Sequence, residues 1–343
     1  MKALALMSGG LDSALAIRVL MDQGIDVLAL HFYTGFCITE RKRRMGVLED
    51  DDPRKFKHDA LSTARSIGVP IEVLDISEEY IKMVTKPKHG YGANANPCID
   101  CRVFMLRAAA DHLEEFGASF VITGEVLNQR PMSQRRPTLG VIEEEAGLPR
   151  LVLRPLSAKL LPSTIPEEQG WVDRGRLLAI EGRSRKPQLE LAGQYGITGF
   201  AQPAGGCCFL ADETYADRFH ELMAHKPDHE LTQDEVMLLG AGRHFRLSDG
   251  VKLIVGRDRL ENNLLARYRA GRIFLTCTTV GAPSALVDGP ADEGLVRLAA
   301  AIVARYSDAE HGAEIPVIVE RDAVSRAMPV KTDKHIDLES LRV

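Results

Sequence analysis

The sequence has 343 residues, which is long enough for two domains that each bury a core of their own. Its apolar content of 45% and charged content of 27% are typical of a soluble globular protein, and no apolar run reaches the ~20 residues of a membrane helix. The first residues do not match a signal peptide, because their apolar run breaks at Gly9 and Gly10, so we expect a cytosolic (cytoplasmic) protein without membrane contact.

The formal net charge of −5 excludes a general electrostatic attraction to nucleic acid. Any RNA binding would therefore depend on local basic segments. Two such segments are "RKRR" at residues 41–44 and "GRSRK" at residues 182–186. Taken alone, a basic run of this kind is typical of a solvated loop.

The first half of the chain alternates strand-like and helix-like segments. Apolar runs typical of strands buried on both faces occur at residues 2–7, 26–32, 71–76, 119–124 and 150–156. Helix signals occur at residues 12–24, 51–68, 101–117 and 186–196. This alternation predicts an α/β domain over residues 1–215 with a doubly wound parallel sheet, and ligands bind such sheets at the carboxyl ends of the strands.

The pattern changes beyond about residue 215. Residues 251–268 and 272–280 have the composition of strands joined by turns, residues 293–307 form an amphipathic helix pattern, and residues 315–320 form a strand pattern. These segments predict a second, smaller α+β domain over residues 216–343.

A glycine turn joins the first strand to the first helix in the stretch "LALMSGGLDSALA". Glycines let the backbone approach a ligand closely, and the N–H groups at the start of the helix favour an anion. The turn lacks the Gly-Lys-Ser/Thr ending of a Walker loop, so transfer of a γ-phosphoryl group is not indicated. The residues that form this candidate phosphate cradle are Ser8, Gly9, Gly10, Asp12 and Ser13.

The turn resembles the SGGxDS signature of the PP-loop ATP pyrophosphatases, which have the adenine nucleotide alpha hydrolase-like fold. The resemblance implies that ATP binds here, that its pyrophosphate leaves, and that the substrate oxygen becomes adenylated. It also implies that Asp12 lies near Mg²⁺, that His31 and Phe32 lie near the adenine, and that Gly124 approaches the nucleotide. An ordinary strand-end residue is the alternative for His31.

The six cysteines occupy positions 37, 98, 101, 207, 208 and 277. In a cytosolic chain they favour metal binding or catalysis over disulfides. Cys98 and Cys101 come at a predicted helix start, where the helix dipole favours the thiolate, and "GGCCF" supplies Cys207 and Cys208.

With these motifs, and with the segment "VITGEVLNQRPMSQ", the chain is similar to tRNA 4-thiouridine and 2-thiouridine synthetases over roughly residues 1–212. The resemblance implies that the thiols deliver sulfur, with Cys98, Cys101, Cys207 and Asp12 as catalytic residues. A [4Fe–4S] cluster on Cys98, Cys101 and Cys207 is the favoured arrangement, because thiolates suit iron–sulfur clusters and an open iron could bind sulfide.

Several alternatives to that cluster remain open. A persulfide pair formed by Cys98 and Cys207 would need no metal, a closed Cys₄ zinc site would be structural, and Cys208 could replace Cys207 as third ligand. Glu125 or Gln134 could give acid–base help to the reaction, or could simply form hydrogen bonds in a loop.

The stretch "VKLIVGRDRLENNLLARY" is similar to an RNA-binding module of ribosome quality-control factors. Gly256, Arg257, Asn262 and Asn263 carry the similarity, and Asp258 stands where asparagine is usual. A hairpin in which glycine and asparagine only serve a turn is the alternative. If the similarity holds, the arginines contact RNA phosphates. They are Arg257, Arg259, Arg267 and Arg269.

Together these features predict an ATP-dependent tRNA sulfurtransferase that makes a thiouridine. The partners would be tRNA and a sulfur donor, either sulfide or a persulfide carrier, and a homodimer is left open. Insertion of sulfur into a small molecule or cofactor precursor by the same chemistry is one alternative. A non-catalytic RNA-binding protein switched by ATP is another, and such a protein would not need the cysteines.

Overall fold

The computed structural model describes residues 1–36, 60–198, 200, 208–226, 228 and 230–343. The chain divides into two compact units at residue 207, and each is described by itself. The boundary at residues 215 and 216 that the sequence indicates stays a prediction. No helix of the described residues has both the length and the apolar character needed to cross a membrane.

The first unit contains a five-stranded parallel sheet in the order β3-β2-β1-β4-β5. Its strands are β1 (Lys2–Leu6), β2 (Asp26–Tyr33), β3 (Ile71–Asp75), β4 (Phe120–Ile122) and β5 (Val152–Leu153). Its helices are α1 (Leu11–Met21), α3 (Ala60–Ile67), α4 (Ser77–Thr85), α5 (Cys98–Asp111), α6 (Arg136–Glu145), α7 (Ile165–Glu168) and α8 (Lys186–Tyr195).

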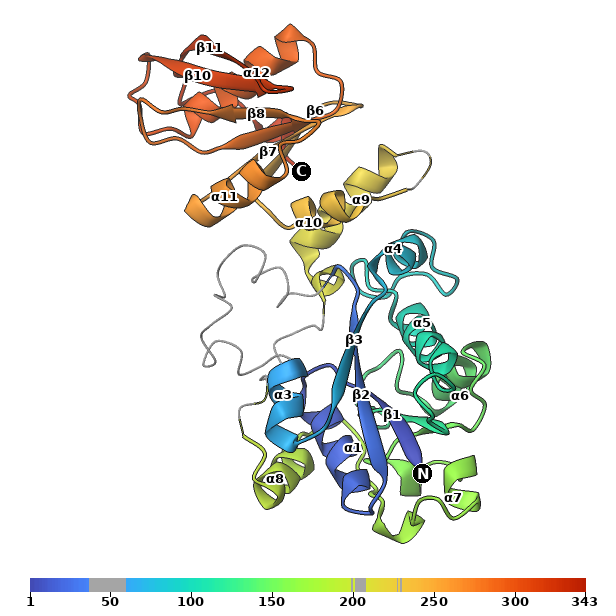
Figure 1. Cartoon of the computed structure of the whole chain (residues 1–343). Helices are drawn as coiled ribbons and strands as arrows, with labels where there is room; N and C mark the ends of the chain where they lie inside the picture. Colours follow the sequence, from blue (N-terminus) through green and yellow to red (C-terminus); the bar gives the residue numbers. More distant parts are fainter. Residues whose placement is uncertain (37–59, 199, 201–207, 227, 229) are drawn as a thin grey trace. The chain divides into compact units, whose positions relative to one another are not determined.

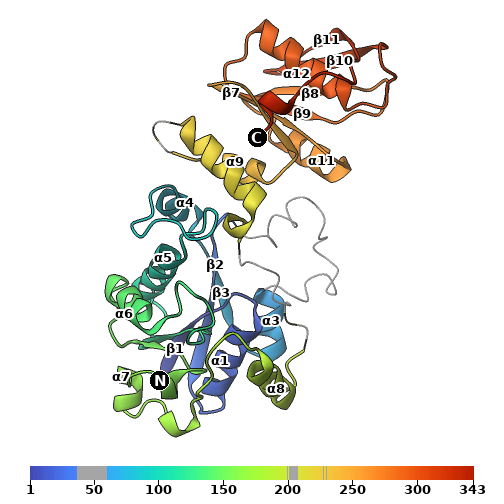
Figure 2. The same ribbon diagram turned by 180° about the vertical axis from the view of Figure 1, so that it is seen from behind.

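Helices cover both faces of this sheet, as Figures 1 and 2 show from opposite sides. Ala3 and Ala5 of β1 pack with α1, α3 and α8, whereas Leu4 between them packs with α5 and α6. The alternation of side chains along a strand therefore builds two cores from one apolar run. The predicted doubly wound α/β fold is confirmed.

The second unit contains a six-stranded antiparallel sheet in the order β11-β10-β8-β9-β7-β6. The strands are β6 (Arg243–Ser248), β7 (Val251–Val255), β8 (Ile273–Thr276), β9 (Ala285–Asp288), β10 (Glu314–Arg321) and β11 (Val324–Lys331). The helices are α9 (Glu213–Ala224), α10 (Gln233–Leu239), α11 (Arg259–Arg267) and α12 (Glu293–Arg305).

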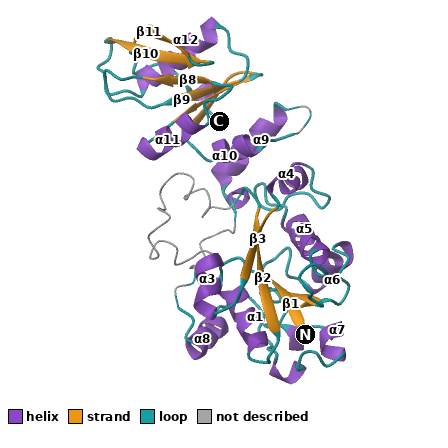
Figure 3. Ribbon diagram, viewed as in Figure 1, coloured by secondary structure: helices purple, strands orange, loops and turns teal. Residues whose placement is uncertain are grey.

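Helices also flank this second sheet, which Figure 3 colours by secondary structure. Leu253 and Val255 of β7 pack in a core with α12, and Ile254 packs in a smaller core with α10 and α11. The predicted α+β class of this part of the chain is confirmed.

The segment after β7 differs from the sequence prediction. Residues 259–267 form helix α11 and not a strand or a turn. The Asp258 side chain accepts a hydrogen bond from the amide of Glu261 (2.9 Å) and so caps the helix, while Leu264 and Leu265 are buried. The predicted helix at 51–68 begins outside the described residues, and its later part is α3.

Candidate nucleotide-binding site

The glycine turn lies at the carboxyl end of β1, where the chain enters α1. Gly9 has a φ of +77°, and Gly10 caps α1 without any side-chain hydrogen bond to the helix. The Thr63 hydroxyl donates to the Gly9 carbonyl (3.2 Å), and the Ser13 hydroxyl donates to the Gly10 carbonyl (2.8 Å). Both carbonyls are therefore hydrogen-bonded within the protein. The first N–H groups of α1 form the positive end of the helix dipole, which attracts an anion.

The turn also lies at the switch point of the sheet. β1 and β4 are neighbours, and the strand order runs in opposite directions on either side of this pair. Gly124 follows β4, and a Cβ atom on it would lie 2.4 Å from the Ser13 nitrogen. The structure thus brings Gly124 against the first turn of α1, and its approach to a nucleotide stays a prediction.

Asp12 belongs to a polar cluster beside the turn. The Gln129 side-chain amide donates to Asp12 Oδ2 (3.0 Å), and Arg185 Nη2 lies 3.5 Å from Asp12 Oδ1. The side-chain amide of Gln188 in α8 donates to the side-chain oxygen Oε1 of Gln129 (3.2 Å). Among the described residues, Asp12 Oδ1 has no hydrogen-bond donor although it is buried. A buried carboxylate oxygen without a donor fits a cation such as Mg²⁺.

His31 and Phe32 at the end of β2 have different surroundings. His31 donates from Nδ1 to the carbonyl of Met7 (2.9 Å), so its ring lies beside the residue that precedes Ser8. Phe32 is 8% exposed and packs in the core under α5 and α6. His31 is therefore placed next to the turn and Phe32 inside the domain, and their contact with adenine stays a prediction.

Cys98 and Cys101 lie in the first turn of α5, and both side chains are half-buried. Asp100 between them accepts hydrogen bonds from the amides of Lys88 and His89 (3.0 Å each), which fixes the preceding loop on the helix. Because α5 leads into the parallel strand β4, its N-terminus lies at the same edge of the sheet as the glycine turn.

Side-chain contacts also connect the cysteine turn to the glycine turn. Arg102, next to Cys101, lies 3.5 Å through Nε from Glu125 Oε1, and Glu125 follows the Gly124 that touches α1. Cys207 lies outside the described residues, and Cys208 begins the described part of the second unit. Over the described ranges, no group of three His, Cys, Asp or Glu residues is placed to hold a metal.

Glu125 is a buried carboxylate held by two arginines. Arg154 Nε donates to Glu125 Oε2 (3.0 Å), and the Thr123 hydroxyl donates to the same oxygen (3.2 Å). Burial opposes ionisation of Glu125, but the charges of Arg154 and Arg102 and these hydrogen bonds outweigh it and hold its pKa below the ordinary value. Glu125 is thus a poor proton donor.

The side chain of Gln134 accepts a hydrogen bond from the amide of Arg130 (3.0 Å), which shapes the loop.

The segment of the second unit that is similar to an RNA-binding module joins β7 to α11. A Cβ atom on Gly256 would lie 2.1 Å from Asn262 Oδ1, which accepts a hydrogen bond from the amide of Ser284 (3.0 Å). Glycine and asparagine therefore pack a strand end against a helix, and do not form a hairpin turn. Arg257 donates from Nε to Glu261 (3.0 Å), so its guanidinium is paired, while Arg259 is exposed.

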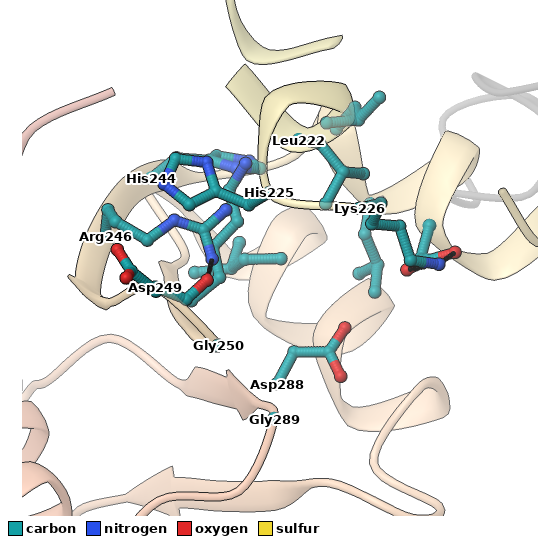
Figure 4. Close-up of a pocket in the computed structure, with 14 residues that line it drawn as sticks. Leu222, His225, Lys226, His244, Arg246, Asp249, Gly250, Asp288 and Gly289 are labelled. Atoms are coloured by element: carbon teal, nitrogen blue, oxygen red, sulfur yellow. Dashed lines mark hydrogen bonds and ion pairs between the residues drawn. The ribbon is translucent and has the colours of Figure 1, made fainter. Parts of the chain in front are cut away.

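A cavity of about 220 Å³ lies in the second unit between α9, α10 and the β6–β7 hairpin (Figure 4). His244, Arg246 and Lys252 line one wall, and Glu221 binds both Arg246 Nε and Lys252 Nζ (2.6 Å each). Burial lowers the pKa of Lys252 to about 8 despite the carboxylate of Glu221. The single carboxylate of Glu221 is thus shared between two cations, Arg246 and Lys252.

The first unit is thus a doubly wound α/β domain with a glycine turn at its switch point, and the second unit is an α+β domain. Residues 1–159 match the family model described as thiamine biosynthesis protein (ThiI). Residues 242–340 match the model described as NFACT protein RNA binding domain. Both resemblances inferred from the sequence are confirmed by these matches.

Individual proteins similar to this chain include tRNA-thiolating enzymes. The tRNA-specific 2-thiouridylase MnmA of Listeria innocua is 23% identical over 276 residues, covering 76% of this chain and 69% of that protein. A protein named "probable tRNA sulfurtransferase" from Thermococcus kodakarensis is 26% identical over 155 residues, covering 45% of this chain and 36% of that protein. The chain thus spans about a third of the length of this second relative.

Among solved structures, the match to one described as a 4-thiouridine synthetase–RNA complex with bound ATP covers 69% of this chain and 53% of the chain in that structure. The sequence identity is 22% and the TM-score 0.36.

The polar cluster around Asp12 is not predictable from the sequence. Gln129 and Arg185 were visible within quoted motifs, but nothing in the sequence paired either of them with Asp12. Gln188 lies within a predicted helix and carries no local signal of a binding role.

Proposed function

We propose that this chain is an ATP-dependent tRNA sulfurtransferase that makes a thiouridine. The observation that carries the proposal is the placement of the glycine turn and a two-cysteine helix turn at one edge of one sheet, connected through Gly124, Glu125 and Arg102. The similarity to tRNA-thiolating proteins supports tRNA as the substrate.

The first half of the reaction makes the uridine oxygen a leaving group. The N–H groups at the start of α1, with Ser8 and Ser13, hold the β- and γ-phosphates of ATP. The uridine carbonyl oxygen attacks the α-phosphorus, the bond from that phosphorus to the bridging oxygen breaks, and pyrophosphate leaves. Mg²⁺ would neutralise the departing charge, and Asp12, whose buried Oδ1 has no hydrogen-bond donor among the described residues, is the residue that would hold it.

The second half of the reaction replaces that oxygen by sulfur. A sulfur nucleophile adds to the activated ring carbon, the carbon–oxygen bond breaks, and AMP leaves with the oxygen. Cys98 and Cys101 are the described thiols at this edge of the sheet, and their spacing in the first turn of α5 puts both on one side of the helix.

The carrier of the sulfur is a separate question. The two thiols fit two of the three ligand positions of a [4Fe–4S] cluster, with Cys207 as the third, and such a cluster would offer an iron to sulfide. A persulfide pair of Cys98 and Cys207 is the alternative without a metal. Anaerobic purification followed by iron and zinc assays and a visible spectrum separates these cases. A colourless, metal-free and active protein would leave only the persulfide.

The test of the function is a reconstituted reaction with unmodified tRNA and ATP, run with sulfide and, in parallel, with a persulfide donor, followed by mass analysis of the nucleosides. We expect thiouridine from the wild type and none from Cys98→Ser or Cys101→Ser, while both variants still bind ATP. Cys277→Ser in the second unit is the matched control, and it should retain activity. Thiouridine formation by Cys98→Ser at the wild-type rate would contradict the assigned role, and no thiouridine from the wild type on any tRNA would contradict the function.

A further inference from the structure

The basic segment "GRSRK" at residues 182–186 does not form a uniformly solvated loop. Arg183 is exposed, but the side chain of Arg185 is only 21% exposed and its Nη2 lies 3.5 Å from Asp12 Oδ1. The segment directly precedes α8, and α8 packs on α1 in the core of the first unit. The packing of these two helices therefore brings one arginine of the segment to the glycine turn.

Three buried polar atoms of this cluster have no hydrogen-bond partner among the described residues. They are Asp12 Oδ1, Arg185 Nε and Gln188 Oε1. Gln188 is fully buried, so water does not satisfy its oxygen from outside. Buried polar groups are normally hydrogen-bonded, and three exceptions in one place indicate a missing partner.

The chemistry of the three atoms defines that partner. Arg185 Nε is a donor and requires an acceptor oxygen, whereas Asp12 Oδ1 requires a cation or a donor, and Gln188 Oε1 requires a donor. A polyphosphate with bound Mg²⁺ supplies all three, because it offers phosphate oxygens, the cation, and the water molecules that Mg²⁺ retains. A phosphate without the metal would satisfy only the arginine.

The turn itself carries no positive side chain. The stretch from Ser8 to Ser13 contains one acidic residue and no lysine or arginine. The helix dipole contributes about half an elementary charge, which is small against the charge of a triphosphate. A side-chain cation would therefore have to come from another element, and Arg185 contacts the turn through Asp12.

We infer that Arg185 is the phosphate-binding cation of the nucleotide site and contacts the β- and γ-phosphates of Mg²⁺–ATP. Without nucleotide, Arg185 pairs with Asp12. When the nucleotide binds, the guanidinium turns to the phosphate oxygens, and the Asp12 carboxylate is released to Mg²⁺. Gln129 holds the Asp12 carboxylate during this exchange, and Gln188 in turn holds the Gln129 side chain. This inference rests on the proposed function only in requiring that the site binds ATP.

Isothermal titration of the full chain with a non-hydrolysable ATP analogue and, separately, with AMP tests this role. Arg185→Gln should weaken the affinity for the analogue with Mg²⁺ roughly ten- to a hundredfold, the size of a lost charge-assisted hydrogen bond, and change the affinity for AMP less than about twofold. Arg185→Lys should fall between Arg185→Gln and the wild type. Arg183→Gln is the matched control and should bind both ligands as the wild type does.

The outcomes separate this inference from the proposed function. Equal affinity of Arg185→Gln and the wild type for the analogue would overturn the inference, and so would an equal loss of analogue and AMP binding, which would indicate a structural role. If the wild type binds the analogue and Arg185→Gln does not, the inference stands even where the wild type thiolates no tRNA. That result would overturn only the proposed function.

Discussion

Gly124 is the residue at which the sheet and the nucleotide turn meet. A Cβ atom there would contact the backbone of Ser13 at 2.4 Å and that of Asp12 at 2.5 Å, and backbone cannot move aside as a flexible side chain can. The absence of a side chain at this position therefore sets how closely α1 approaches the end of β4.

The substitution Gly124→Ala should therefore displace α1 and weaken ATP binding at least tenfold, as measured by isothermal titration. Gly140 in α6 is a matched control, because a Cβ atom there would meet nothing within 4 Å. Gly140→Ala should leave ATP binding unchanged and stabilise the first unit by about 0.5–1 kcal/mol, because alanine is the better helix former. Equal ATP affinities for the two variants would contradict this assignment.

Glu125 links the cysteine helix to the strands through paired charges. Its pKa is lowered, so its ionisation stabilises the folded state above the ordinary value of 4.5, and this contribution disappears as the pH falls through the lower folded value. Glu125→Gln should destabilise the first unit by about 3 kcal/mol at neutral pH, because it leaves buried arginine charge uncompensated.

Urea unfolding followed by the fluorescence of Trp171, the single tryptophan and a residue of the first unit, measures this change. The difference between wild type and Glu125→Gln should shrink below pH 4.5. A difference that stayed constant down to pH 3 would show that the charge is not the cause.

At the scale of elements, burial determines which parts of the fold the sequence predicts. β1 and β2 are predictable because both faces are covered and every position along the central run is apolar. β11 is different, because most of its side chains are exposed and show no apolar run. It is recognised as a strand only through its pairing with β10. Helix α11 differs from the sequence prediction although Asp258, followed by Glu261 three positions later, is a local helix-start signal.

The candidate site shows the same division between local and distant information. The glycine turn and the pair Cys98 and Cys101 are contiguous motifs, so the sequence identified them directly. Arg185 joins them only because α8 packs on α1, and Glu125 joins α5 only through Arg102. Such contacts depend on tertiary packing and leave no periodic signal in one sequence.

The β6–β7 hairpin and α9 share a buried charge network whose pH dependence is predictable. Lys252 has a pKa near 8 when folded and 10.5 ordinarily, so between these values the unfolded chain binds a proton that the folded chain does not. The free energy of unfolding should therefore rise with pH over this range, by at most about 1.4 kcal/mol per pH unit.

Lys252→Met removes this titration, and Glu221 keeps Arg246 as a partner. Urea unfolding followed by far-ultraviolet circular dichroism at pH 7.5 to 10.5 should show the rise for the wild type relative to Lys252→Met. Parallel curves for the two proteins would show that Lys252 keeps its charge in the folded state.

At the scale of the molecule, the charges of the two units suit different tasks. The chain has a net charge of −5, so nucleic acid must be attracted by local groups. In the first unit Arg185 is paired with Asp12 at the nucleotide turn. In the second unit Arg257 is paired with Glu261, and Arg269 Nε lies 3.5 Å from Glu320. Arg259 is exposed in the first turn of α11, where the helix dipole disfavours a cation and a phosphate would stabilise it.

Arg259 is therefore the arginine that best tests RNA binding by the second unit. The salt dependence of binding counts phosphate contacts, because each neutralised phosphate contributes about 0.7–0.9 to the slope of log K against log salt concentration. Arg259→Gln should lower the magnitude of this slope for tRNA by about that amount and raise the KM for tRNA, with ATP affinity unchanged.

Arg297→Gln is the matched control, because Arg297 is an exposed arginine of α12 in the same unit. Filter binding between 50 and 300 mM salt measures the slopes, and equal slopes for the two variants would remove Arg259 from the RNA interface while leaving the nucleotide site untouched.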